Sequence, residues 1–403
     1  MMTETILTNA RIICPDREIQ GSLVIEGNCI AEILPRNLSG GIDLRGAFLI
    51  PGIIDIHTDY LERELAPRPS AKIPLELALH VMDLRALSCG LTTVCTAARI
   101  SEEREGPAGS WRGDGLALAR CFEKMIPQLR AHHMIHVRWS PNFLPVDHIL
   151  DELLKLNSIA NLVYNDDTPG QRQFRDIEAQ IRQRAARQNI SLEEAKQKID
   201  ERAERARMVN NRVEVRRRIK GRIPIGSHDD TTIEHVLEAH ETGATLSEMP
   251  CTIEAARKAK ELGMMVCMGA PNYYRGGSHC GNLACHDAMA ENLVDIICSD
   301  YHFPSMLACA LRMAEEGMPL HEAMRLFTMN PALHLGLGEK TGSIEIGKQA
   351  DLVAFHPYKS YGDVVHVWIC GRERFSSIMD ARDYNTEQAE EDQLAEKGTV
   401  SAD

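Results

Sequence analysis

The segment LIPGIIDIHTDYLE, residues 49–62, begins with an apolar run, and His57 and Asp59 stand at the end of that run. Residues i and i+2 of a β-strand face the same side, so the two side chains are expected to point together from one strand end. Imidazole and carboxylate groups are both common ligands of divalent metals. Taken alone, the pair fits a metal site and a core histidine beside a capping aspartate equally well.

Seven more short apolar runs follow, each succeeded by a helical pattern. They are GLTTVCTA (90–97), HMIHVRW (133–139), ANLVYND (160–166), IPIGSHDD (223–230), GATLSEMP (243–250), MMVCMGAP (264–271) and VDIICSDY (294–301). Several are too continuously apolar for strands with an exposed face, which favours a parallel sheet covered on both sides. Eight strand–helix units in residues 51–339 predict an α/β fold, a (β/α)8 TIM-like barrel.

Both ends of the chain have the alternating pattern of short β-strands. Residues 1–50 include ILTNARII and GSLVIEGNCIAEIL, and residues 340–375 include GSIEIGKQADLVAF and VVHVWICGRERF. We expect the two ends to pair into one small, discontinuous β-sandwich domain beside the barrel. Residues 376–403 are polar and acidic with few apolar residues, and they are predicted to form a frayed tail.

The segment 171–222, between the fourth and fifth predicted strands, is strongly basic. It holds 16 Lys or Arg against 8 Asp or Glu, a net charge of +8 in a chain of net charge −13. Its composition favours helices, and SLEE at 191–194 is a capping box. We predict a helical insertion. Either it is a solvated pair of helices that covers one side of the barrel, or its basic face meets an anionic ligand or a partner subunit.

Composition narrows the class of protein. Apolar content of 44% and charged content of 26% are typical of a globular protein, and no apolar run reaches the length of a membrane helix. The net charge of −13 argues against binding to nucleic acid or to anionic membranes. The 12 cysteines contain no C-x-x-C pair and the N-terminal sequence has no secretory pattern, so we expect a reduced, cytoplasmic protein.

Polar residues close other predicted strands as well. The fifth run contains His228 near its end, and the eighth contains Asp300. The carboxyl ends of barrel strands meet at one rim, so these two residues are expected to converge there with the pair of the first strand. Such a set can hold a divalent metal with an open position for water, and Asp300 can act as general base. The alternative is that the four residues lie there by coincidence.

The motifs PGIIDIH and TMNPALHLGLGEKTGSIEIGKQADLVAF, with Asp300, resemble the amidohydrolase superfamily of metal-dependent hydrolases. More specific blocks are HTDYLERELAPRP, NDDTPGQRQF, SHDDTT, MGAPN, RGGSHCGNLA and SDYHFPS. Together they resemble one family within it, the PhnM diphosphatases of the carbon–phosphorus lyase pathway. The similarity runs from about residue 4 to residue 370. Many metal hydrolases have His-x-His at the end of the first barrel strand. In the PhnM family His-x-Asp takes its place, so Asp59 need not mark a lost metal site.

The resemblance implies a reaction at phosphorus. It is the metal-dependent hydrolysis of α-D-ribose 1-methylphosphonate 5-triphosphate to the 5-phosphate and pyrophosphate, in phosphonate catabolism. The cofactor is then one or two divalent metal ions, with Zn expected first and Mn or Fe as the alternatives. The partner is a small phosphorylated sugar, and barrels of this kind often pair as homodimers.

A triphosphate needs cations and backbone amides around it. The loop after the seventh strand offers both, in Arg275, Gly276, Gly277 and Ser278. A Gly-Gly turn lets amides approach phosphate oxygens closely. Arg63 and Arg138 follow other strands at the same rim, although a surface ion pair would also explain each arginine. His279 can be a metal ligand, an acid for the leaving pyrophosphate, or a loop histidine.

Two positions depart from the pattern of the family. An acidic residue able to bridge two metals is expected after HVR of the third strand, where this chain has Trp-Ser at 139–140. A histidine is expected in the block NDDTPGQ, where Asp167 stands. Asp167, or Asp166 beside it, is therefore predicted to supply an oxygen ligand, as is Glu248 of the sixth strand. His136 is expected to face the helices or to pack internally. The number of metals stays open.

Two other functions remain open at this point. One is a different amidohydrolase reaction, such as hydrolysis of a cyclic amide or deamination. The other is a metal-poor barrel that serves as a binding or scaffold subunit. Assays for pyrophosphate and ammonia, together with metal analysis, separate the three.

Overall fold

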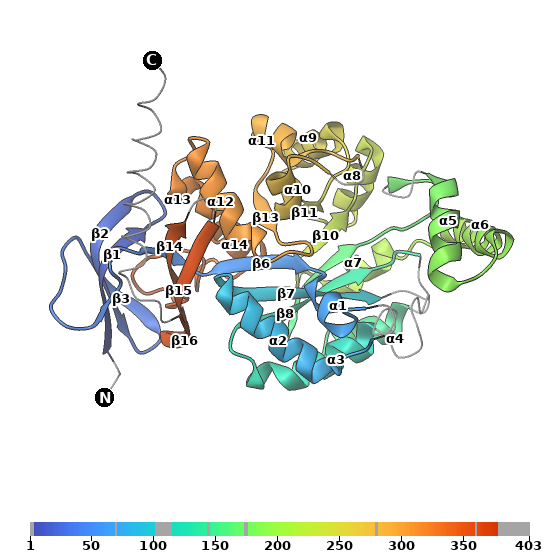
Figure 1. Cartoon of the computed structure of the whole chain (residues 1–403). Helices are drawn as coiled ribbons and strands as arrows, with labels where there is room; N and C mark the ends of the chain where they lie inside the picture. Colours follow the sequence, from blue (N-terminus) through green and yellow to red (C-terminus); the bar gives the residue numbers. More distant parts are fainter. Residues whose placement is uncertain are drawn as a thin grey trace, which may run out of the picture.

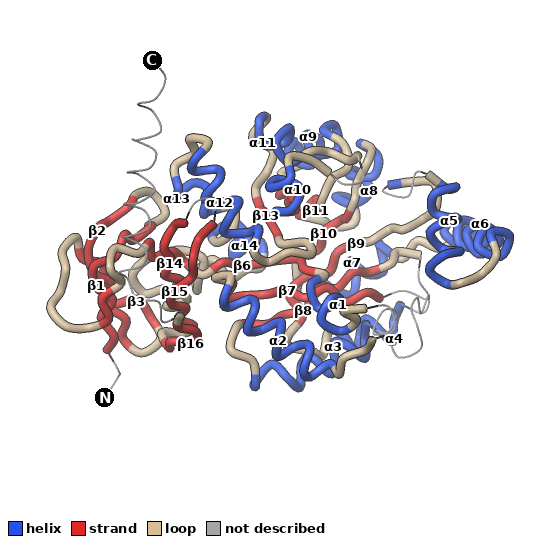
Figure 2. Tube along the Cα trace, in the orientation of Figure 1, coloured by secondary structure: helices blue, strands red, loops and turns tan. Residues whose placement is uncertain are grey.

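The computed structural model describes residues 4–68, 71–100, 115–142, 146–172, 176–278, 281–358 and 361–377. The strands form two sheets, which Figure 2 shows as separate groups, with most helices packed around one of them. His279 and residues 378–403 of the predicted acidic tail lie outside the described residues. None of the described helices is long and apolar enough to cross a membrane.

The first sheet contains eight parallel strands, one in each of the eight predicted runs. They are β6 (Ile53–Thr58), β7 (Leu91–Ile100), β8 (His132–Trp139), β9 (Ile159–Tyr164), β10 (Ile225–His228), β11 (Leu246–Glu248), β12 (Met265–Gly269) and β13 (Ile296–Cys298). Each strand pairs with the next one along the chain. A parallel bridge between Thr58 and Asp300 joins the last strand end to the first. The sheet is thus a nearly closed barrel, and the predicted fold is confirmed.

Helices follow the strands and cover the barrel (Figure 1). They are α1 (Tyr60–Leu65), α2 (Leu75–Ser88), α3 (Gly115–Met125) with the 3-10 turn η1 (Ile126–Gln128), α4 (Val146–Leu153), α8 (Ile233–Glu241), α9 (Ile253–Glu261), α10 (Ala270–Arg275), α11 (Cys285–Ala290), α12 (Ser305–Glu315), α13 (Leu320–Arg325) and α14 (Met329–His334). Thr232 and Thr252 cap α8 and α9 through their side chains. These caps fix where each helix begins, a few residues after β10 and β11.

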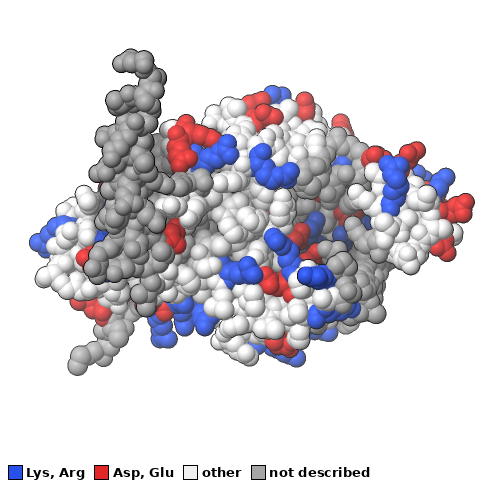
Figure 3. Space-filling model, in the orientation of Figure 1, with Lys and Arg blue, Asp and Glu red and all other residues white. Residues whose placement is uncertain are grey.

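The basic insertion contains three further helices, α5 (Ile177–Gln188), α6 (Leu192–Met208) and α7 (Arg212–Ile219). The capping box is present, with Ser191 and Glu194 bonded to each other's backbone. Figure 1 shows α5 and α6 as a pair at the end of the molecule farthest from the N-terminal strands. On the face drawn in Figure 3, basic and acidic side chains alternate over this pair. The insertion therefore carries a mixed surface there rather than one basic patch.

Both chain ends contribute to the second sheet, as predicted. Its order is β16 (Arg372–Ser376), β15 (Tyr361–Ile369), β14 (Leu352–Tyr358), β5 (Phe48–Pro51), β1 (Glu4–Ile13), β2 (Glu18–Glu26) and β3 (Cys29–Leu34), with β4 (Ile42–Asp43) paired to β1. The predicted sandwich domain is thus built from one hydrogen-bonded mixed sheet, called the end sheet below. It has a core cluster of its own, which includes Leu7, Ile12 and Trp368.

The segment quoted first passes from one sheet to the other. Residues 48–51 form β5 of the end sheet, and β6 of the barrel begins at Ile53. Gly52 lies between them, and a Cβ at this position would be 2.0 Å from Oγ1 of Thr92. Only glycine lets the chain pass β7 so closely. A single core cluster holds Ile50 of the end sheet together with Ile53 of the barrel.

Candidate metal centre

The strand ends enclose a cavity of about 310 Å³ at the carboxyl rim of the barrel. Its lining contains four of the six predicted metal ligands and four of the six predicted substrate-binding residues, namely His57, Asp59, His228, Asp300, Arg138, Arg275, Gly277 and Ser278. Gly276 ends α10 in a left-handed conformation beside this loop, with φ of 77°. Arg63 reaches the carbonyl oxygen of Tyr301, which also lines the cavity, at 3.4 Å.

The backbone is strained where these strands end. Asp229, Met249 and Asp300 have φ between 52° and 60°, a left-handed conformation that residues other than glycine adopt at a cost. Asp300 is held there by two backbone hydrogen bonds, one with His57 of β6 and one with Asp59, which directly follows that strand. Its carbonyl oxygen accepts from the N–H of Asp59 at 2.6 Å, and its own N–H donates to the carbonyl oxygen of His57 at 3.2 Å. These bonds bring the first and last strand ends together.

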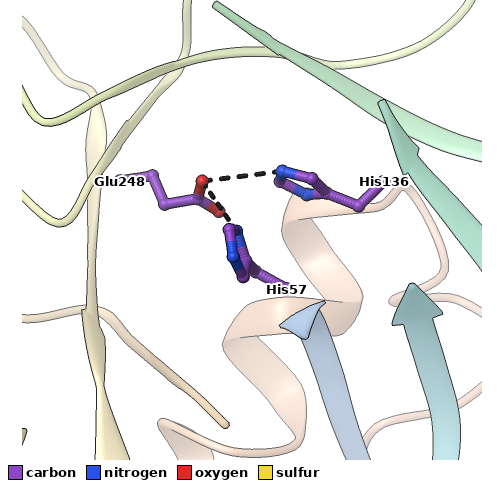
Figure 4. A group of neighbouring side chains, drawn as sticks. All are labelled: His57, His136 and Glu248. Atoms are coloured by element: carbon purple, nitrogen blue, oxygen red, sulfur yellow. Dashed lines mark ion pairs between the residues drawn. The ribbon is translucent and has the colours of Figure 1, made fainter. Parts of the chain in front are cut away.

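Two groups of potential metal ligands share His57. His57, His136 and Glu248 form an inner group that is fully buried (Figure 4). His57, Asp59 and Asp300 form an outer group that lines the cavity. In each group the ligand atoms lie within 4.8 Å of one another. A neutral imidazole offers one lone pair, so His57 can serve only one of the two groups at a time.

Glu248 lies between three histidines. Its Oε2 is 2.8 Å from Nδ1 of His228, 3.0 Å from Nδ1 of His57 and 3.6 Å from Nε2 of His136. The contact with His228 is a hydrogen bond, whereas the contact with His57 is close without hydrogen-bond geometry. Burial alone would raise the pKa of Glu248, but the neighbouring imidazoles outweigh it and hold the pKa well below its ordinary value. Glu248 is therefore an ionised carboxylate.

His136 is a site residue to which the sequence assigned no role. It packs internally, as one of the two expectations had it, but its ring belongs to the inner group. Its Nδ1 is 3.0 Å from the carbonyl oxygen of Ile56, which can only accept, so Nδ1 carries the proton. Burial lowers the pKa of His136 to about 3, so the ring is neutral. Its Nε2 thus presents a lone pair toward Glu248, as a metal ligand would.

The donor set fits a divalent cation. Among the described residues, buried polar atoms without a hydrogen-bond partner include both ring nitrogens of His57, Nε2 of His136, Oε1 of Glu248 and Oδ2 of Asp229. Each such atom costs about 1–3 kcal/mol unless something satisfies it. Burial alone would lower the pKa of His57, but Glu248 and Asp59 outweigh it and raise the pKa well above its ordinary value. The surroundings of His57 therefore attract positive charge. Mixed imidazole and carboxylate ligands suit Zn, Mn or Fe.

Asp59 is shared between the outer group and Arg138. Nη1 of Arg138 lies 3.1 and 3.4 Å from the two carboxylate oxygens of Asp59, and its Nε donates to Oδ1 of Asn165 at 2.8 Å. Burial would raise the pKa of Asp59, but Arg138 and the imidazoles hold it well below its ordinary value. Arg138 therefore keeps Asp59 ionised at the cavity.

Asp167 lies in neither ligand group. Its carboxylate contacts Arg99 and lies 3.4 Å from Arg202 of α6. The neighbouring Asp166 pairs with Arg212 at 2.9 Å. The role of Asp167 as a metal ligand stays a prediction. Its contacts in the structure are those of an anchor for the basic insertion.

Comparisons with known proteins agree with this arrangement. The model of the amidohydrolase family matches residues 48–374. Alpha-D-ribose 1-methylphosphonate 5-triphosphate diphosphatase of Escherichia coli K12 is 33% identical over 388 residues, which cover 92% of this chain and 100% of that protein.

Among solved structures, a Xaa-Pro dipeptidase with bound methionine matches with a TM-score of 0.62 at 15% identity. It covers 93% of this chain and 100% of its own. N-acetylglucosamine-6-phosphate deacetylase from Pasteurella multocida matches with a TM-score of 0.57 at 16% identity and the same coverage. At these identities the structural matches show the fold alone. The family match and the full-length relative show more: this chain belongs to the amidohydrolase family.

Proposed function

We propose that the protein is a metal-dependent diphosphatase that hydrolyses α-D-ribose 1-methylphosphonate 5-triphosphate to the 5-phosphate and pyrophosphate. The relative from E. coli, similar over its full length, bears the name of this activity. The observation that carries the proposal is the make-up of one cavity. The outer ligand group opens on the same space as Arg275 and the Gly277–Ser278 backbone. A polyphosphate ester needs both, a metal at the reacting phosphorus and cations around the other phosphates.

The catalytic metal belongs in the outer group, because the inner group is fully buried and leaves no room for substrate. His57, Asp59 and Asp300 would hold it, with His228 in the same cavity wall. Glu248 then orients His228 through the hydrogen bond to its Nδ1 and lies against Nδ1 of His57, so that the Nε2 atoms serve the metal. Since His57 serves one group at a time, this arrangement supports a single ion.

A bound divalent metal lowers the pKa of water toward 7 and polarises the phosphoryl oxygen. Asp300 accepts the proton of the attacking water, a role favoured by burial, which raises the pKa of its carboxyl group. The water oxygen bonds to the α-phosphorus, and the bond from that phosphorus to the bridging oxygen breaks. Arg275 and the amide groups of Gly277 and Ser278 bind the leaving pyrophosphate. Of the three roles that the sequence leaves open for His279, the one that this reaction would use is that of an acid for the leaving group.

The direct test is pyrophosphate release from the triphosphate by protein purified without chelator. We expect release that a chelator abolishes and that added Zn or Mn restores. Ammonia release from cyclic amides or aminopurines without pyrophosphate release would point to the other amidohydrolase chemistry. Protein that holds no metal and gains no activity from it would point to a binding subunit.

The Asp300→Asn variant tests the general base. Turnover should fall at least about 100-fold, the usual contribution of such a group. Metal content should fall less than in His57→Ala, because asparagine keeps a carbonyl oxygen at the ligand position whereas alanine removes the ligand altogether. Near-normal turnover of Asp300→Asn would refute the role.

A further inference from the structure

A third group of potential metal ligands lies at the opposite end of the barrel. It consists of His132, Asp351 and Cys370, whose ligand atoms lie within 4.8 Å of one another. His132 begins β8, Asp351 directly precedes β14 and Cys370 directly follows β15. The three residues therefore join the floor of the barrel to the end sheet.

This group is separate from the candidate metal centre. His132, Met134 and His136 alternate along β8 and so face the same side of the strand. Met134 packs against the apolar cluster that fills the barrel. The four residue-to-residue steps from His132 to His136 span about 13 Å of strand. A layer of apolar side chains thus divides the two groups.

The distances from His132 to the other two ligands are close to those in a tetrahedral zinc site. Nε2 of His132 lies 3.4 Å from the carboxylate oxygens of Asp351 and 3.8 Å from Sγ of Cys370. Ligand distances of about 2.05 Å for nitrogen and oxygen and about 2.3 Å for sulfur, at tetrahedral angles, place nitrogen and oxygen about 3.4 Å apart. They place nitrogen and sulfur about 3.6 Å apart. The observed spacings need to change by no more than a few tenths of an ångström.

The surroundings hold the ligands as a metal site requires. The carboxylate of Asp351 is buried and accepts hydrogen bonds from the N–H of Cys370 at 2.8 Å and from Oγ1 of Thr341 at 3.1 Å. The amide of Gln349 lies 2.8 Å from Asp351 and 3.1 Å from Nε2 of His132, where its oxygen can become a fourth ligand after a half-turn. The side chain of His132 is 37% exposed, which leaves a path for an ion to enter.

We propose that His132, Asp351 and Cys370 form a structural site for Zn²⁺ or a similar thiophilic cation, which fastens the barrel floor to the end sheet. One nitrogen, one oxygen and one sulfur ligand are a set that zinc accepts. Binding displaces the thiol proton of Cys370, so the ligand is a thiolate. The site is independent of the diphosphatase reaction.

Cobalt is the probe that separates this site from the catalytic one. Thiolate bound to Co²⁺ gives a near-ultraviolet charge-transfer absorption that imidazole and carboxylate ligands do not give. Among the described residues, no cysteine lines the catalytic cavity. Protein stripped with a chelator and titrated with Co²⁺ should show this band. Cys370→Ser should lose the band and bind one equivalent of metal fewer, whatever the enzymatic activity.

Cys251→Ser is the matched control. Its sulfur lies 3.4 Å from the carbonyl oxygen of Asp229, beside the candidate metal centre, so this variant tests whether a thiol near that centre gives a false signal. We expect the band to survive in this variant. His132→Gln changes a half-exposed side chain and should weaken Zn²⁺ binding at least about tenfold, since even the loss of an outer partner costs 10–100-fold. Absence of the band in the natural protein, or its survival in Cys370→Ser, would overturn the proposal.

Discussion

At the scale of single residues, the charge of Glu248 sets the orientation of the imidazoles around it. Its Oε2 accepts a hydrogen bond from His228 and lies 3.0 Å from Nδ1 of His57. Glu248→Gln keeps the size of the side chain and removes the charge. If Glu248 acts through the two histidines, metal binding should weaken about 10–100-fold, and competition with a chelator measures the change.

Glu261→Gln, on the exposed end of α9, is the control and should leave the metal affinity unchanged. A loss far above 100-fold in Glu248→Gln would instead identify Glu248 as a direct ligand, which is the role that the sequence alone predicts for it.

Arg275 is exposed at the rim of the cavity, where it can bind the outer phosphates of the substrate. Arg275→Ala removes a charged hydrogen-bond donor worth about 1.5 kcal/mol, so KM for the triphosphate should rise about tenfold. A monophosphate ester, which does not reach this far, should be affected less. Arg325→Ala on α13 is the control. Equal changes in KM for both substrates would contradict the placement of Arg275.

At the scale of elements, Asp167 joins the end of β9 to the basic insertion. It contacts Arg99 and Arg202, and its side chain is 3% exposed. As an anchor, Asp167→Asn should lower the free energy of unfolding by roughly 2–3 kcal/mol, because it breaks a largely buried ion pair. Metal content should stay unchanged. Urea unfolding and elemental analysis of the same preparation test both statements, and loss of metal would support the predicted ligand role instead.

The eight barrel strands could be predicted because several of the runs are apolar throughout, as strands covered on both faces must be, and because a helical pattern follows each run. The side that each residue faces was harder to predict. His136 was expected to face the helices or to pack internally, and only the closed barrel shows that its ring points inward, into a ligand group. His57 and Asp59 were predictable because both their spacing and their strand end carried information.

At the scale of the whole molecule, the pairing of the two chain ends was predictable from their alternating pattern, but the order of the strands was not. β5 pairs with β14 on one side and with β1 on the other, a non-local register that no local pattern encodes. The group of His132, Asp351 and Cys370 has the same origin, because its members come from three distant segments. No spacing within the sequence could have indicated it.

The passage from the end sheet to the barrel at Gly52 leads to a prediction for the whole fold. Gly52→Ala would place Cβ 2.0 Å from Oγ1 of Thr92, so β6 and β7 must separate, and the free energy of unfolding should fall by about 1–3 kcal/mol or more. Since one core cluster spans both sheets, the barrel and the end sheet should lose stability together.

Fluorescence of variants that keep only Trp139 in β8 or only Trp368 in β15 follows each sheet during urea unfolding. Gly277→Ala, whose added Cβ meets nothing within 4 Å, is the control for stability. Separate midpoints for the two tryptophans would show that the sheets unfold independently, and an unchanged midpoint in Gly52→Ala would show that β6 and β7 are not held this close.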